Sequence, residues 1–205
     1  MKRENGKKGA YHHGNLEESL LNAVDELATK FGLEAVTLRG CAKLVGVSPS
    51  SAFRHYIDKR ALLTSFATRA LHQLSDAMTD AEDKAQRNGT NAFHAVGLAY
   101  IEFALDKPAF FRAMWREETI YPNDADYLAA ANELSAHLKA GFRDTIEDDD
   151  PARFSPQELL AWSSVHGLAN LFVDGPVAKG ETKSQKLERA NRMLQALTPA
   201  FDKDK

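Results

Sequence analysis

The side chains with the most distinctive chemistry lie at positions 46–56, in the stretch GVSPSSAFRHY. Ser48 is a preferred helix N-cap and Pro49 is favoured at the first helical position, so the stretch predicts a short helix. The hydroxyls of Ser50 and Ser51 then lie in its first turn, beside backbone N–H groups that have no partner within the helix. Such a turn suits a phosphate oxygen or a base edge. Simple exposure of two serines to solvent is the alternative interpretation.

A second short helix precedes this one and is expected to position it. Thr37 is a suitable N-cap, apolar residues recur through positions 38–45, and Gly46 is placed to end the helix with a positive φ angle. Two short helices joined by a glycine-containing turn form a helix-turn-helix, whose second helix enters a DNA major groove about 12 Å wide. The opposite face carries the expected core anchors Val47, Ala52 and Tyr56. The pattern predicts contact with double-stranded DNA.

The rest of the chain also has helical periodicity. A first helix is predicted over 16–31, with core-facing Leu16, Leu20, Val24, Leu27 and Phe31. In the helix over 38–45, the residues expected to face the core are Leu38, Cys41, Leu44 and Val45. A fourth helix is predicted from Asp58, with core-facing Leu62, Phe66, Leu71, Leu74 and Met78. Five more are predicted over 91–105, 108–115, 124–146, 155–173 and 184–197. With no strand, hairpin or repeat signal, the pattern predicts an all-α fold of about nine helices.

Composition bounds the class of protein. The chain has 205 residues, of which 43% are hydrophobic and 27% are charged, as is typical of folded domains. Its first 14 residues are basic and lack the apolar stretch of a signal peptide. No apolar run reaches the roughly 18 residues that a membrane span requires. A single cysteine, Cys41, fits a reducing compartment, so we expect a cytoplasmic protein that does not contact a membrane.

Charge is divided unevenly along the chain. Residues 1–60 carry ten Lys/Arg against seven Asp/Glu, a balance of +3, and the remainder carries sixteen against twenty-two, a balance of −6. This asymmetry suggests one end that faces a polyanion and a body that avoids it. A basic arm before the first helix, with Lys2, Arg3, Lys7 and Lys8, is expected either to follow the phosphate backbone or to have no function of its own.

Catalytic and metal chemistry find little support in the sequence. The seven histidines are scattered, Asp148–Asp150 form a run that is better interpreted as a solvated loop, and no phosphate-binding glycine loop or nucleophile motif is present. We expect no catalytic residue, no metal and no cofactor. An all-α enzyme or a small-molecule-binding module, with an incidental helix-turn-helix, remains the alternative.

From Leu16 to Leu63 the chain resembles the tetracycline-repressor (TetR) family of bacterial transcriptional regulators. The matching segments are Phe31-Gly32, Thr37-Leu38-Arg39, Ala42, Gly46-Val47-Ser48, Phe53-Arg54-His55-Tyr56, and Lys59 followed by Ala61-Leu62-Leu63. Further along, Trp162, His166 and Gly167 resemble the Trp–His–Gly signature of one TetR-type C-terminal domain class, as does KPAFFRAMW at 107–115.

The resemblance implies a DNA-binding region over 1–60. Its expected contact residues are Thr37, Arg39, Ser48, Pro49, Ser50, Ser51, Phe53, His55 and Lys59. Arg39 would take a guanine edge in bidentate fashion or, as readily, a phosphate. Phe53 departs from the family, which most often has a tyrosine there, so the phosphate contact of that tyrosine is expected to be lost or replaced by a neighbour. For Thr37 an ordinary N-cap and a phosphate contact are compatible.

The same resemblance implies a dimerisation and effector-binding domain over 61–205. Helices near 156–173 and 184–198 would pair with their twofold mates, and the homodimer would bind a palindromic operator as a repressor or an activator. A small-molecule effector is expected to contact Phe103, Phe111, Trp115, Trp162 and His166. Aromatic residues at helical spacing are more often plain core, and Trp162 and His166, four residues apart on one helix face, would equally well pack a dimer seam.

Overall fold

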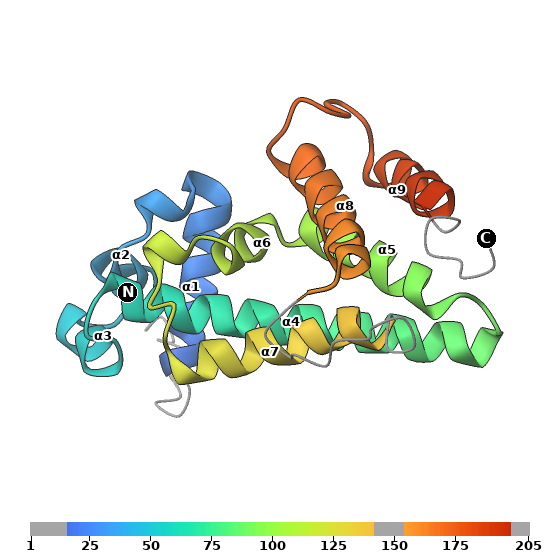
Figure 1. The fold of residues 1–205 in the computed structure, drawn as a ribbon. Coiled ribbons are helices and arrows are strands. Elements are labelled where there is room, and N and C mark those ends of the chain that lie inside the picture. The colour runs from blue at the N-terminus through green and yellow to red at the C-terminus, as the bar shows by residue number, and fades with distance from the viewer. Residues whose placement is uncertain (1–15, 142–153, 198–205) are drawn as a thin grey trace, which may run out of the picture. The chain divides into compact units, whose positions relative to one another are not determined.

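The computed structural model describes residues 16–141 and 154–197 (Figure 1). Over these residues it contains nine α-helices, two short 3₁₀ turns and no strand, so the expected all-α fold is confirmed. The chain divides into two compact units, of which the first ends at Leu62 and the second begins at Leu63. The basic arm and Asp148–Asp150 lie outside the described residues.

The first unit is built from three helices around a small core. α2 packs against both α1 and α3, and a 3₁₀ turn packs on α1. The elements are α1 (Leu16–Phe31), the turn η1 (Leu33–Ala35), α2 (Leu38–Val45) and α3 (Pro49–His55). Leu20, Val24 and Ala52 are among the side chains that close this core.

Two apolar residues of the first unit do not face the core as expected. Phe31 is 60% exposed and Leu44 is 44% exposed. Phe31 is the last residue of α1, where Gly32 turns the chain with a φ angle of 84° and brings Leu33 into the core, at 5% exposure. The ammonium of Lys30 lies 5.1 Å from the centre of the Phe31 ring. Helical periodicity cannot show at which turn the core ends, and that is why the assignment of Phe31 was wrong.

The second unit is formed by longer helices. α5 packs against α6, α8 and α9, and α7 packs against α8 (Figure 1). Its elements are α4 (Lys59–Asn88), which begins in the first unit, α5 (Ala92–Asp106), α6 (Pro108–Met114), the turn η2 (Glu117–Thr119), α7 (Ala125–Ala140), α8 (Pro156–Val173) and α9 (Lys183–Leu197). Within the described residues, none of the helices has the length and apolarity that a membrane span requires.

The predicted core face of α4 is confirmed, because Leu62, Phe66, Leu71, Leu74 and Met78 are all buried. α7 lies along α4 (Figure 1), where His137 Nε2 is 3.1 Å from the buried hydroxyl of Ser75. The helix predicted over 124–146 ends at Ala140 in the structure, and residues 142–146 lie outside the described part.

Candidate functional site

The first turn of α3 carries a cluster of serine hydroxyls. Ser48 has extended backbone angles and its Oγ accepts the backbone N–H of Ser51 at 3.2 Å, so the predicted N-cap is confirmed. The same Oγ lies 2.9 Å from the hydroxyl of Ser50 and 2.8 Å from that of Ser51. Pro49 occupies the first helical position. The three hydroxyls are therefore held together at the exposed tip of the helix; we call Ser48, Ser50 and Ser51 the serine tip.

The turn before the serine tip needs glycine. Gly46 ends α2 in the left-handed conformation, with a φ angle of 79°, and its N–H is bonded back to α2. Thr37 caps the other end of α2, because its Oγ1 accepts the N–H of Gly40 at 3.0 Å. A Cβ added at Gly40 would lie 3.0 Å from that same Oγ1 and 3.5 Å from Leu27 Cδ1. Glycine at position 40 thus makes room for the cap that orients α2.

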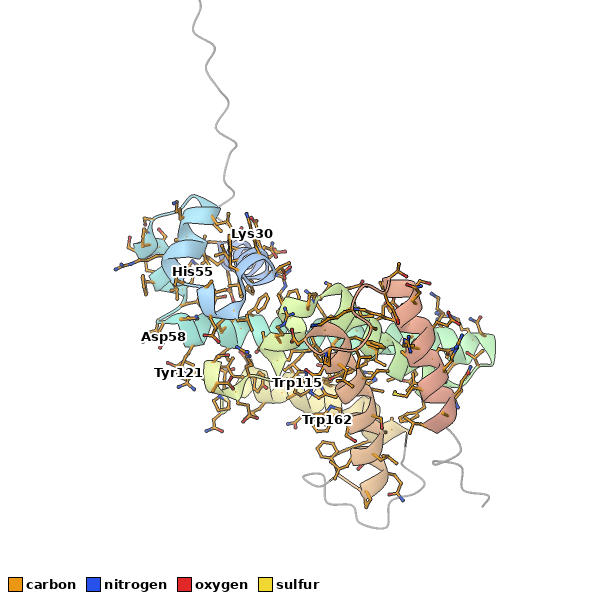
Figure 2. All side chains as sticks on the ribbon, turned by 90° about the horizontal axis from the view of Figure 1, so that it is seen from above. Lys30, His55, Asp58, Trp115, Tyr121 and Trp162 are labelled. Atoms are coloured by element: carbon orange, nitrogen blue, oxygen red, sulfur yellow. The ribbon has the colours of Figure 1, made fainter. Side chains whose placement is uncertain are left out.

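The remaining charged and aromatic candidates lie on α2, on α3 and at the start of α4. Arg39 and Phe53 are exposed, as is His55, the last residue of α3 (Figure 2). Lys59 is half-buried and its ammonium donates to the carbonyl of Glu34 at 3.0 Å, which joins the start of α4 to η1. An ammonium has three N–H donors, so Lys59 can also donate to a phosphate oxygen. The structure thus gives Lys59 a structural role that the sequence did not predict.

A cluster of rings forms the second candidate site, within the second unit. Four of the five expected effector residues meet here: the Trp115 ring lies 5.6 Å from Trp162 and 5.2 Å from His166, and the Phe111 ring lies 5.5 Å from His166. Figure 2 shows the two indoles next to each other. Tyr100 joins them, with its ring 6.1 Å from Phe111. We call Tyr100, Phe111, Trp115, Trp162 and His166 the ring cluster.

The fifth candidate, Phe103, belongs to another surface. It makes no ring contact with the cluster and instead lines an open groove of about 910 Å³ between α4 and α5, with residues such as Asp80, Lys84 and Asp106. Tyr100, which the sequence-based set omitted, takes its place. The available signal was a tyrosine among the apolar residues of α5, since a buried phenol usually has a hydrogen-bond partner.

His166 is held by hydrogen bonds on both ring nitrogens. Asn170 Nδ2 donates to the backbone carbonyl of His166 at 3.0 Å and lies 2.8 Å from its Nε2. The first bond fixes the amide orientation, because a flipped amide would set two oxygens against each other. Nε2 must then accept, so the neutral ring carries its hydrogen on Nδ1 and donates it to the hydroxyl oxygen of Tyr100, 2.8 Å away.

The ring cluster is poorly solvated, and its ionisable groups are shifted accordingly. Burial lowers the pKa of His166. Burial also raises the pKa of Tyr100, and the indole N–H groups of Trp162 and Trp115, which face the phenolic oxygen, oppose part of that rise. The indole N–H of Trp115 is itself buried and has no acceptor within hydrogen-bond distance. The site therefore holds uncharged donors in excess of acceptors.

The lowered pKa of His166 predicts a dependence of stability on pH. The unfolded chain binds a proton at a histidine pKa of about 6.5, while the folded state resists protonation. His166 thus contributes its full stability above about pH 6.5, and that contribution falls as the pH drops toward the lower folded-state pKa. We expect His166→Gln to flatten the fall of the unfolding free energy below pH 6.5, measured by urea denaturation at several pH values. His55→Gln, at an exposed position, controls for the loss of an imidazole, and equal slopes in wild type and His166→Gln would contradict the prediction.

α8 also presents an outward face. Leu160 is 43% exposed and Leu171 is 41% exposed, and eleven residues, or three turns, separate them on one side of the helix. Gly167 lies between them, and a Cβ added there would meet no atom within 4 Å. The start of α8 is fixed by the predicted capping box, in which Glu158 Oε2 accepts the N–H of Ser155 at 2.6 Å.

Comparison with known proteins agrees with this architecture. Residues 93–197, just over half of the chain, match the family described as tetracyclin repressor-like, C-terminal domain. A curated relative, the uncharacterized HTH-type transcriptional regulator YobS of Bacillus subtilis (strain 168), is 29% identical over 100 residues. That alignment covers 49% of this chain and 51% of the relative, so the chain spans about half the length of the curated relative that it matches.

Solved structures share the fold. A protein of unknown function from Rhodococcus sp. RHA1 is 24% identical, with a TM-score of 0.67 over 92% of this chain and 98% of its own. The TetR-like transcriptional regulator LfrR from Mycobacterium smegmatis, in complex with proflavine, is 16% identical, with a TM-score of 0.54 over 88% and 94% of the two chains. With the family match extending over α5 to α9 and the helix-turn-helix before it, the chain belongs to the tetracycline-repressor (TetR) family of transcriptional regulators.

Proposed function

We propose that this protein is a cytoplasmic, homodimeric regulator that binds a palindromic DNA operator through residues 1–60 and responds to a small molecule through residues 61–205. The observation that carries the proposal is the serine tip, exposed at the start of α3 and preceded by the glycine turn of a helix-turn-helix. A slim polar helix end of this kind fits the major groove.

The contacts with DNA divide by chemistry. The hydroxyls of Ser50 and Ser51 are suited to a base edge or a phosphate, and Pro49 offers an apolar surface to a thymine methyl group. Donors to the DNA backbone are assigned to Thr37, Arg39, His55 and Lys59, and Arg39 is also suited to a guanine. Phe53 is 46% exposed and has no donor, so it contributes packing only.

Dimerisation is proposed through α8 and α9. The outward face of α8 exposes Leu160 and Leu171, and Gly167 between them leaves space for a second helix to approach. An exposed apolar stripe of this kind marks an interaction surface. The resulting homodimer would carry two recognition helices, and dimeric helix-turn-helix proteins read half-sites about one DNA turn, roughly 34 Å, apart.

The effector is proposed to bind at the ring cluster. A small-molecule effector is in keeping with LfrR, a structural neighbour that was solved in complex with proflavine. Binding would regulate DNA affinity only by as much as the ligand prefers one dimer shape over the other. Loss of DNA binding on ligand addition would make the protein a repressor released by its effector, which is the form we favour.

The test is fluorescence anisotropy of the protein with duplex DNA from upstream of its own gene, against a scrambled duplex, over a salt series. We expect affinity for the upstream duplex to exceed affinity for the scrambled duplex by at least about 10³-fold, which is the low end for specific DNA binding. Equal affinity for the two duplexes at every salt concentration would contradict binding to an operator near the gene, and genome-wide selection of bound fragments would then decide between a distant operator and no operator.

A further inference from the structure

Several hydrogen-bond donors of the second unit are directed at one oxygen atom, the hydroxyl oxygen of Tyr100. His166 donates to it from Nδ1 at 2.8 Å, and the indoles of Trp162 and Trp115 lie near enough to lower its pKa, although the N–H of Trp115 reaches no acceptor. The hydroxyl of Tyr100 adds a donor of its own. Tyr100 is 4% exposed, so water does not satisfy this group from the surface.

The count of donors and acceptors at this point does not balance. Because Nδ1 of His166 already carries a hydrogen, it cannot accept from the Tyr100 hydroxyl, whose hydrogen is left without an acceptor. The buried N–H of Trp115 also lacks an acceptor. Buried donors in folded proteins are nearly always paired, and one that is not requires an explanation. Two unpaired donors in one cluster of rings point to a ligand that supplies the acceptor.

We propose that the ring cluster binds an uncharged, largely aromatic small molecule through a carbonyl-type oxygen, which accepts hydrogen bonds from the hydroxyl of Tyr100 and the indole N–H of Trp115. This inference rests on the proposed function, in which the cluster is the effector site, and it names the class of effector: an aromatic ketone, quinone, lactone or amide. A carbonyl oxygen has two lone pairs and therefore accepts both donors.

The absence of charge in the ligand follows from the residues around it. The donors are neutral, and protonation of His166 would set a new Nε2–H against the N–H of Asn170, so the ring does not become a cation to pair with an anion. The ammonium of Lys139 lies 5.5 Å from the centre of the Phe154 ring, which itself packs on Trp162, so this cation is engaged by Phe154 and not by the donors. A carboxylate would lose its hydration without gaining a counterion at the donors.

The aromatic side chains of the ring cluster indicate that the ligand has a flat, apolar body. Trp115 and Trp162 are half-buried, while Phe111, whose ring lies 5.5 Å from that of His166, is 1% exposed. The indoles are in contact, with ring centres 5.6 Å apart, so a ligand enters by parting them. The aromatic body of the ligand then stacks on the two indoles and replaces the contact between them.

The test compares three probes with one naphthalene ring: 2-acetylnaphthalene, which carries a neutral acceptor, 2-naphthoate, which carries a charge, and 2-isopropylnaphthalene, which has neither. Calorimetry with the full-length protein is expected to show that the ketone binds at least tenfold more tightly than the other two. Trp115→Phe is expected to weaken the ketone by about tenfold, the scale of one hydrogen bond, and to leave 2-isopropylnaphthalene unchanged. Phe103→Leu, in the groove between α4 and α5, is the control and is expected to change none of the three affinities.

A spectroscopic measurement separates hydrogen bonding from packing. The carbonyl stretch of ¹³C-labelled 2-acetylnaphthalene is expected to move to lower frequency on binding, and by less in Trp115→Phe and in Tyr100→Phe. Equal affinity for the ketone and the hydrocarbon, tighter binding of the naphthoate, or an unshifted carbonyl would overturn the inference. Operator binding with and without the ketone separates the two proposals: the expected ranking of probes with unchanged operator affinity supports the ligand class and contradicts the role of the site as effector switch.

Discussion

Ser50→Glu is expected to lower operator affinity by about 100-fold, or roughly 2.8 kcal/mol at 1.4 kcal/mol per tenfold. Ser50 lies at the exposed tip of α3, with its hydroxyl 2.9 Å from that of Ser48. A carboxylate there would face base edges and phosphates at close range, and like charges at an interface cost several kcal/mol. The fold itself should not suffer, because an acidic residue in the first turn of a helix is stabilising by about 0.3–1 kcal/mol. Anisotropy with the operator duplex measures the loss.

The chain contains a matched control for this substitution. Ala125 lies in the first turn of α7, as Ser50 lies in the first turn of α3, and both are exposed. Ala125→Glu therefore adds the same charge to a first helical turn outside both proposed interfaces, and it is expected to leave operator affinity unchanged. Ser50→Gln separates size from charge. A loss of affinity shared by Ser50→Glu and Ala125→Glu would mean that net charge, and not the serine tip, controls binding.

The elements that carry these residues could be predicted because their signals are local. Ser48 with Pro49, and Ser155 with Glu158, mark helix starts through contacts that span three residues, and both caps are present in the structure. Gly46 was predictable in the same way, because the turn itself requires a positive φ angle, whatever the rest of the fold is. Phe31 was wrongly placed because its exposure depends on where Leu33 returns to the core, which no periodicity records.

The ring cluster was predictable only in part, because its bonds join distant segments. Trp162 and His166 share a helix face by spacing alone, but the bond from His166 to Tyr100 links residues 66 positions apart. Phe103 is three residues from Tyr100 on α5, yet one lines the groove toward α4 and the other meets α8. The sequence indicates that α5 is apolar around most of its surface, and only tertiary packing determines which aromatic ring faces which neighbour.

Leu160→Glu combined with Leu171→Glu is expected to convert the protein from dimer to monomer at micromolar concentration. Full burial of one leucine contributes about 1.5–3 kcal/mol, and a twofold seam contains each of these partly exposed leucines twice. The loss of four such side chains therefore weakens association by about 100-fold or more, before the cost of burying four carboxylates is added. Sedimentation velocity over a concentration series measures the shift. Leu128→Glu on α7 is the matched control, because Leu128 is 43% exposed, as is Leu160.

The same variant tests whether dimerisation and DNA binding are coupled. A monomer holds one serine tip and contacts one half-site, so it gives up the effective concentration that links two half-sites in the dimer. Operator affinity is therefore expected to fall together with dimer affinity. Gly167→Met, whose Cβ would meet no atom within 4 Å in its own protomer, is expected to act on the dimer and to reproduce the loss. A monomeric variant with undiminished operator affinity would contradict the coupling between dimerisation and DNA binding. The outward face of α8 would then serve a contact other than the dimer that binds the operator.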